Sequence, residues 1–183
     1  MELSKFDLEE ALKLAQKFDT FALGQLHDYY YPQVFCYVDF RLHNPAVSQT
    51  ITGEVFKLLP SSWGKIGDEV DDLQTWLFNT ASSQVNEHVR DNLTLIPLES
   101  DLVNEDPAIT ISEEALWLGR LVRNALKGLT PEQQHILALR FTRQRALTEI
   151  AKITGKNLAD VRSLQFTGLM ILRQLLEEEA NAE

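Results

Sequence analysis

One stretch, "LTEIAKITGKNLADVRSLQFTGLMILRQLL" at residues 147–176, constrains the fold more than any other part of the chain. It joins a short helical pattern to a longer one, with Gly155 between them. Ala151 lies four residues before this glycine, Val161 six residues after it, and Leu164 three residues further on. A small residue allows two helices to cross closely, a glycine adopts the left-handed turn, and later apolar residues hold the second helix. The spacing predicts a helix-turn-helix, although Lys156 stands where an apolar residue is common.

The second helix of this motif is expected to start near Asn157 or Leu158 and to present a polar face. Arginine and glutamine side chains can read base edges, whereas lysine and serine are better suited to phosphates. The alternative is an ordinary helical hairpin inside a bundle. The residues predicted to face solvent or a DNA groove are Lys156, Asn157, Asp160, Arg162, Ser163, Gln165 and Phe166, with Arg173 further along the same helix.

The charge of the chain is unevenly distributed, and this asymmetry favours nucleic-acid binding by one segment only. The net charge is −10, which by itself argues against nucleic-acid binding. However, residues 1–115 contain 20 acidic and 7 basic residues, while residues 116–176 contain 3 acidic and 10 basic ones. A basic segment inside an acidic chain indicates two units with different partners.

Helical spacing of apolar residues continues along almost the whole N-terminal part of the chain. One helix is expected around Phe21–Val38 with an interruption at Pro32, a second ends near Pro60, and a third covers about 71–90. Cys36 is expected to be buried on the first of these helices. "EEALKLAQKF" and "LLEEEANAE" read as solvated helix ends. No strand-rich segment is present, so the predicted fold class is all-α. The residues at roughly helical spacing in the first helix are Phe21, Leu26, Tyr30, Val34, Tyr37 and Val38. Those expected to line one face of the third helix are Leu73, Trp76, Leu77, Thr80, Ala81 and Val85.

A change of composition separates two predicted domains. Residues 92–115 include two prolines, several acids and no base, with no sustained period, which is typical of a linker. The predicted domains are therefore residues 1–91 and residues 116–183. In the second domain "LTPEQQ" predicts a helix start, because Thr130 can cap it, Pro131 fits its first position and Gln133 can complete a capping box.

Composition also limits the classes of function. A single cysteine gives no disulfide framework, and the N-terminus lacks the continuous apolar run of a signal peptide. No apolar run is long enough for a membrane span, so no membrane partner is expected and a cytoplasmic location is favoured. The four histidines lack metal-ligand spacing, and no nucleophile motif or phosphate-binding glycine loop is present. We expect no enzyme, no metal and no cofactor.

At this point a family resemblance is carried by the C-terminal sequence. "LVRNALKGLTPEQQHILALRFTRQRALTEIAKITGKNLADVRSLQFTGLMILRQLL" resembles the C-terminal domain of bacterial sigma factors of the extracytoplasmic-function (ECF) group. In that family, this domain binds the minus-thirty-five promoter element through its helix-turn-helix. The resemblance implies promoter DNA and RNA polymerase core as partners, a monomer, and location at the nucleoid when polymerase is bound. It also allows an anti-sigma factor as a partner.

The N-terminal sequence is similar to the other conserved sigma domain, but it departs from the family pattern. "TITGEVFKLLPSSW" resembles the segment that docks on polymerase, which implies docking by Glu54, Val55, Phe56 and Lys57. "LQTWLFNTASSQVNEHVR" resembles the helix that contacts the minus-ten strand, which implies Trp63, His88 and Arg90 as strand contacts. For Trp63 a role in packing remains an alternative, and Trp76 is expected in the core.

The departures remove charged groups from both predicted contact surfaces. The acidic run before the docking segment is Ser48, Gln49 and Thr50, and the basic pair of the strand-binding helix is Ser82 and Ser83. On the recognition helix a frequent arginine is Thr167. The predicted function is a divergent ECF sigma factor that directs promoter-specific initiation. Two alternatives stay open: a sigma-like decoy that binds polymerase or an anti-sigma factor without initiating, and a two-domain helix-turn-helix regulator that senses a ligand.

Overall fold

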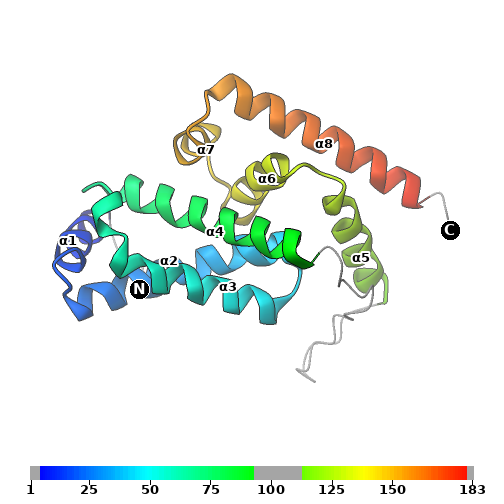
Figure 1. The fold of residues 1–183 in the computed structure, drawn as a ribbon. Coiled ribbons are helices and arrows are strands. Elements are labelled where there is room, and N and C mark those ends of the chain that lie inside the picture. Colours follow the sequence, from blue (N-terminus) through cyan, green and yellow to red (C-terminus); the bar gives the residue numbers. More distant parts are fainter. Residues whose placement is uncertain (1–4, 93–112, 181–183) are drawn as a thin grey trace.

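The part of the chain that the structure describes, residues 5–92 and 113–180 of a computed structural model, is almost entirely helical (Figure 1). These residues contain no strand, so the predicted all-α fold class is confirmed. They form eight α-helices and two short 3-10 helices in the order α1 Lys5–Ala15, α2 Thr20–Leu42, α3 Pro45–Leu58, η1 Leu59–Ser61, η2 Trp63–Lys65, α4 Val70–Asn92, α5 Glu113–Lys127, α6 Pro131–Arg143, α7 Leu147–Thr154 and α8 Leu158–Ala180.

Helices α1 to α4 pack against one another and form what we call the N-terminal bundle. The predicted apolar faces of α2 and α4 supply most of its core, because side chains three or four residues apart share one side of a helix. Phe21 is an exception with 76% exposure, since it points away from the face that carries Leu26. Cys36 is also exposed, so the prediction that it is buried is wrong. The predicted residues with buried side chains are Leu26, Tyr30, Val34, Tyr37, Val38, Leu73, Leu77, Ala81 and Val85, while Trp76 and Thr80 are half-buried.

Helix α2 is continuous through Pro32, so the predicted interruption there is wrong. Proline has no N–H to donate to the carbonyl four residues earlier, which here belongs to Asp28. Both residues are exposed, and water can therefore donate to that carbonyl. Next to the gap, the Gln33 side chain donates a hydrogen bond to the Tyr29 carbonyl at 2.9 Å. The helix tolerates this proline because the lost hydrogen bond lies on its solvent side.

Helix α1 is an integral part of the N-terminal bundle rather than a solvated end. Leu8, Ala11, Leu12 and Ala15 are all buried against α2 and α4. The prediction of a solvated end is therefore wrong, because the apolar residues of this helix recur at helical spacing between its charged ones.

The turn after α1 carries backbone strain at Phe18, which has a φ of 63° and a side chain that is 64% exposed. The Asp19 N–H donates to the Leu14 carbonyl at 3.1 Å, and the Phe18 N–H donates to the Ala15 carbonyl at 2.9 Å. This pattern ends a helix with one left-handed residue, a position that usually carries glycine. A bulky side chain there costs about 1–2 kcal/mol.

We therefore expect Phe18→Gly to raise the free energy of unfolding by about 0.5–1 kcal/mol, after allowing for the greater freedom of glycine in the unfolded chain. Urea unfolding followed by circular dichroism would measure the change. Phe18→Ala removes the ring but keeps the left-handed strain. An equal gain in that control variant would show that the ring, and not the backbone, is the cause.

Helices α5 to α8 form the C-terminal bundle, and two predicted local features are confirmed there. Thr130 and Gln133 make the predicted capping box at the start of α6, with reciprocal hydrogen bonds of 3.0 and 3.3 Å. Gly155 ends α7 with a φ of 65°, and α8 begins at Leu158, where the helix-turn-helix prediction placed it. Ile150, Ile153 and Val161 are buried and hold α7 and α8 together.

The two bundles lie against each other, as Figure 1 shows, with α6 beside α2 and α7 beside α4. One hydrophobic cluster includes core residues of the N-terminal bundle together with residues of α6, α7 and α8. Most of the segment predicted as an acidic linker, residues 93–112, lies outside the described residues. The outer residues of the predicted linker, 92 and 113–115, belong to helices, since α4 ends at Asn92 and α5 begins at Glu113.

Candidate nucleic-acid interface

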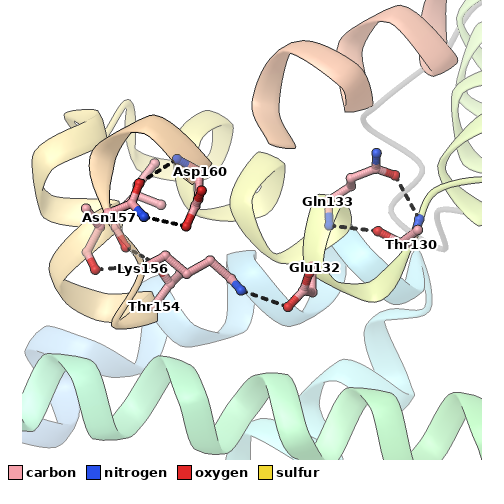
Figure 2. A network of polar contacts seen from close by, with 9 residues as sticks. Thr130, Glu132, Gln133, Thr154, Lys156, Asn157 and Asp160 are labelled. Carbon is pink, nitrogen blue, oxygen red and sulfur yellow. Dashed lines mark hydrogen bonds and ion pairs between the residues drawn. The ribbon is translucent and has the colours of Figure 1, made fainter. Parts of the chain in front are cut away.

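The start of α8 is fixed by its own first residues and by the α7 turn (Figure 2). The Asp160 N–H donates to Oδ1 of Asn157 at 2.8 Å, and the Asn157 side-chain amide donates to the Asp160 carboxylate at 2.6 Å. Asn157 is therefore the N-cap of α8, which satisfies a backbone donor that would otherwise lack a partner. This predicted DNA contact thus has a structural role that sequence reasoning did not assign.

One side of α8 is free to meet a ligand. Arg162, Ser163 and Phe166 are exposed, Phe166 to 66%, and Gln165 is half-exposed. Within residues 5–92 and 113–180, the Arg162 guanidinium makes no hydrogen bond or ion pair. Helix α8 lies on the outside of the molecule, away from the N-terminal bundle (Figure 1). The arrangement presents a cationic and aromatic helix face at the width that a DNA major groove admits.

Two other predicted DNA contacts are already engaged in ion pairs. Lys156 lies 2.8 Å from Glu132 of α6, and its side chain is only 30% exposed (Figure 2). Arg173 pairs with Glu177 one turn later at 2.8 Å, and both side chains are largely exposed. Exposed pairs of this kind contribute little, so a phosphate can replace the carboxylate at Arg173 more readily than at Lys156.

Thr167, which stands at a frequent arginine position of the family, helps to hold α8 in place. Its hydroxyl accepts a hydrogen bond from the Gln133 side-chain amide of α6 at 3.2 Å and can donate to the Ser163 carbonyl at 2.9 Å. The lost cation is therefore replaced by a contact between helices.

Comparison with known proteins agrees with this geometry. Residues 125–174, which contain α6, α7 and most of α8, match the family model "Sigma-70, region 4". This segment is similar to sigma-70 region 4, and we refer to residues 125–174 as region 4. The ECF RNA polymerase sigma factor BldN of Streptomyces coelicolor (strain ATCC BAA-471 / A3(2) / M145) is 26% identical to the chain over 177 residues, which cover 93% of this chain. The chain spans 66% of the length of that relative.

A solved structure is also similar in sequence over most of the chain. It is a chain in the structure of the RsbN-BldN complex, with 22% identity, covering 90% of this chain and 98% of that one. The TM-score is 0.39, so the assignment to region 4 depends on the family model and on the geometry of the α7 turn.

Outside region 4, the residues predicted to contact the minus-ten strand are not all close together. Trp63 lies in η2 just before α4, whereas His88 and Arg90 lie near the other end of that helix. Eighteen or more helical residues separate Val70 from these two side chains, or roughly 27 Å at 1.5 Å per residue. Arg90 is exposed and lies 3.7 Å from Glu87 and 3.3 Å from Asp91.

Trp63 is half-buried and packs against the core cluster, which favours the packing role over capture of a base. Its indole Nε1 is buried without a hydrogen-bond partner among the described residues. Trp76 also packs against this cluster and is half-buried, in agreement with its predicted position.

Of the residues predicted to dock on polymerase, some are accessible at the surface of α3 and one is buried inside the N-terminal bundle. Glu54 and Lys57 are exposed and Phe56 is half-buried, all on α3. Val55 is fully buried, so its side chain cannot contact a partner in this conformation. The prediction for Val55 is wrong in this respect, because a helix that packs on α2 and α4 must turn one residue of such a run inward.

A polar junction between region 4 and the N-terminal bundle was not predicted. The Arg41 guanidinium of α2 donates to the Tyr37 hydroxyl and to Ser82 Oγ, both at 3.1 Å, and to Asn86 Oδ1 at 2.6 Å. The Tyr37 hydroxyl also lies 2.5 Å from Nδ1 of His135 on α6. Since Arg41 donates to this oxygen, the tyrosine donates its hydrogen to a neutral imidazole.

A second arginine, Arg145, crosses the junction from the α6–α7 turn. It is 7% exposed, and its guanidinium carbon lies 4.6 Å from the centre of the Phe78 ring on α4. Gln33 accepts a hydrogen bond from it at 3.4 Å, and Gln74 accepts at 2.6 Å in the amide orientation that its surroundings favour. Burial lowers the pKa of Arg145. Sequence alone gave no sign of this role, since Arg145 is one of many cations in a basic segment.

The junction lies beside the part of α4 that carries the Ser82–Ser83 pair. A cavity of about 250 Å³ lies between Ser82, Ser83 and Asn86 of α4 and His135 and Lys156 of region 4. Asn79 of α4 also donates a hydrogen bond to the Ile153 carbonyl at 2.9 Å. The Ser82–Ser83 pair, which replaces two cations of the family, therefore faces region 4. Two cations at these positions would lie close to Arg41 and Lys156.

The junction should make stability depend on pH through His135. Burial, followed by repulsion from Arg41 and Lys156, lowers the pKa of His135 to about 4, while Glu132 acts in the opposite direction. An unfolded histidine has a pKa of about 6.5, so below that pH the unfolded chain binds the proton more readily. The stability contribution of neutral His135 is complete above about pH 6.5 and is lost progressively as the pH falls to about 4.

We expect the unaltered chain to lose about 2 kcal/mol more than His135→Gln between about pH 7 and about pH 5 in urea unfolding. Glutamine keeps a polar side chain at this position but cannot be protonated in this range. Parallel pH profiles of the two proteins would contradict the assignment.

Among the described residues, no group of three or more histidine, cysteine or acidic side chains could hold a metal ion. No described helix combines the length and the hydropathy needed to cross a bilayer.

Proposed function

We propose that this chain is a sigma factor of the ECF group, which binds RNA polymerase core and directs promoter-specific initiation of transcription. The observation that carries the proposal is the free face of α8, with Arg162, Ser163 and Phe166 exposed, inside a segment that matches region 4. A turn closed by a left-handed glycine and a capped helix start hold this face in position.

Within region 4, each exposed side chain has a role that follows from its chemistry. Arg162 and Gln165 read base edges of the minus-thirty-five element, since both can form paired hydrogen bonds with one base. Ser163, Lys156 and Arg173 contact phosphates, which sets the register without reading sequence. Phe166 makes apolar contacts in the groove.

The remaining parts of the proposal concern the whole chain. Residues 1–91 bind polymerase core and the minus-ten strand, residues 92–115 link the domains, and residues 116–183 bind the minus-thirty-five element. The chain acts in the cytoplasm as a monomer and performs no chemistry, which belongs to the polymerase, and it needs no cofactor. BldN is a sigma factor by name, and its occurrence in a complex with RsbN is consistent with an additional protein partner for this chain.

A second candidate is a sigma-like regulator that binds polymerase without initiating. The position of Ser82 and Ser83 at the junction with region 4 favours it, because in this arrangement α4 offers fewer contacts to a DNA strand. A third candidate, a two-domain regulator, requires dimerisation and tight binding to duplex DNA without polymerase.

Run-off transcription with purified polymerase core, together with assays of core binding and of duplex binding, separates the three candidates. Template-specific transcripts support the sigma factor, and core binding without transcripts supports the second candidate. Duplex binding by a dimer in the absence of core supports the third. Capture of core by a tagged chain, repeated with Glu54→Ala and Phe56→Ala together, tests the docking surface. Unaltered capture by this variant would place docking elsewhere.

A further inference from the structure

Four aromatic side chains meet on the outer side of α2 and α3, and we call them the aromatic face: His27, Tyr31, Phe35 and Phe56. The ring centres of His27 and Tyr31 are 4.9 Å apart, and those of His27 and Phe56 are 5.0 Å apart. Tyr31 lies 5.8 Å from Phe56 and 6.5 Å from Phe35, with the latter pair nearly parallel. Contacts at these distances are favourable and hold the rings in a fixed arrangement.

The aromatic face is accessible to a partner. His27 is exposed, the other three rings are half-exposed, and the described core cluster includes neither Tyr31 nor Phe35. The core-facing residues Tyr30, Val34 and Tyr37 lie on an adjoining strip of α2, and Tyr37 contacts Phe78 of α4 and His135 of α6. Figure 1 shows α3 on the side of the bundle away from α7 and α8. Contact between the two bundles therefore leaves this face open.

The same surface has lost the means for ionic docking. Of the three positions that carry acids in the family, Ser48 is fully buried and donates a hydrogen bond to Asp39 at 3.0 Å. An acid at this position would not reach a partner. Gln49 and Thr50 are exposed but neutral. Asp28, whose carboxylate lies 3.2 Å from Nδ1 of His27, and Glu54 on α3 carry exposed negative charge on these two helices.

We infer that this chain docks on RNA polymerase core through the aromatic face, with Asp28 and Glu54 as an acidic rim, and not through an acidic run. The inference rests on the proposed function and names the kind of contact at that site. Phe56 belongs both to the predicted docking segment and to the aromatic face, so the two surfaces are continuous. The matching surface of the polymerase would present apolar groups edged by basic side chains. Aromatic side chains that become fully desolvated dominate interfaces of this kind.

The two modes of docking respond differently to salt and to substitution. Ionic contacts at a surface are screened as salt rises, whereas apolar contacts are not. We expect the affinity of the full-length chain for purified core to change less than about threefold between about 50 mM and about 500 mM salt. Tyr31→Ser and Phe35→Ser together should weaken binding by about tenfold or more, and Asp28→Asn with Glu54→Gln by less than about threefold.

Three further variants control for folding and for general loss of apolar surface. Tyr31→Phe keeps the ring and should bind core within about twofold of the unaltered chain. Phe141→Ser removes an exposed aromatic residue from α6 and should also leave core affinity unchanged. Urea unfolding of the Tyr31→Ser, Phe35→Ser double variant checks that its fold is retained, and Phe35→Leu gives a better-packed alternative if it is not.

Each result decides between outcomes. A selective loss in the aromatic variants, at either salt concentration, supports the inference. Core binding that survives the loss of Tyr31 and Phe35, or that depends more on Asp28 and Glu54, would overturn this inference and leave the proposed function intact. An equal loss in Phe141→Ser would also overturn it. Failure of the unaltered chain to bind core would overturn the proposed function and this inference together.

Discussion

Changing Arg162 and Gln165 together to alanine should reduce promoter-specific transcription by at least about tenfold, since each paired contact with a base contributes about 1–3 kcal/mol of discrimination. Both residues lie on the exposed side of α8, and neither side chain is needed for the buried contacts with α6 and α7. The folded state and the affinity for polymerase core should therefore stay the same. Run-off transcription from a matched promoter, with core binding measured in parallel, tests this expectation.

A control for the loss of charge is Lys17→Ala. Lys17 is exposed in the turn after α1, in the N-terminal bundle. Its substitution by alanine removes one positive charge, as the substitution of Arg162 does. Promoter-specific transcription with the Lys17→Ala variant should remain within about twofold of that with the unaltered chain, because long-range effects between exposed charges are screened. If both variants lost activity equally, general charge would be the cause and base reading by α8 would be excluded.

The second large effect is expected at Phe78, where removal of the ring should lower the free energy of unfolding by about 3–5 kcal/mol. Phe78 is 1% exposed, packs edge-on against Tyr37 at 5.5 Å and carries the Arg145 guanidinium on its face. Phe78→Ala would leave a cavity in the N-terminal bundle and would also deprive a buried cation of its aromatic partner. The change therefore acts on both sides of the junction.

Urea unfolding at neutral pH measures this loss, and Phe141→Ala is the matched control. Phe141 is 52% exposed on α6, so its removal should change stability by no more than about 0.5 kcal/mol. A loss below about 1 kcal/mol for Phe78→Ala would mean that the ring is not tightly enclosed.

The sequence was sufficient to predict most helices and the helix-turn-helix. Leu26, Tyr30 and Val34 recur every four residues, and such a period has one interpretation when no strand signals compete. Gly155 could be assigned because only a left-handed residue closes that turn, and its φ is 65°. Local rules of this kind need no knowledge of distant contacts.

The predictions from sequence are wrong or incomplete where contacts between residues far apart in the chain determine the structure. Pro32 breaks helices in general, but it is tolerated here because its side of α2 faces solvent. Val55 was grouped with its neighbours, yet the angle at which α3 packs turns this residue inward. The junction of Tyr37 with His135 joins residues 98 positions apart, and no periodic pattern in either helix indicates such a contact.

The position of Cys36 affects how the size of the molecule should be measured. It is the single cysteine of the chain, and its thiol is exposed on α2. Air oxidation can therefore link two molecules covalently through one sulfur–sulfur bond, and no larger chain of links can form. Such a product would imitate the dimer that the two-domain regulator requires. Samples kept under a reductant, or a Cys36→Ser protein, are needed before any dimer is attributed to the fold.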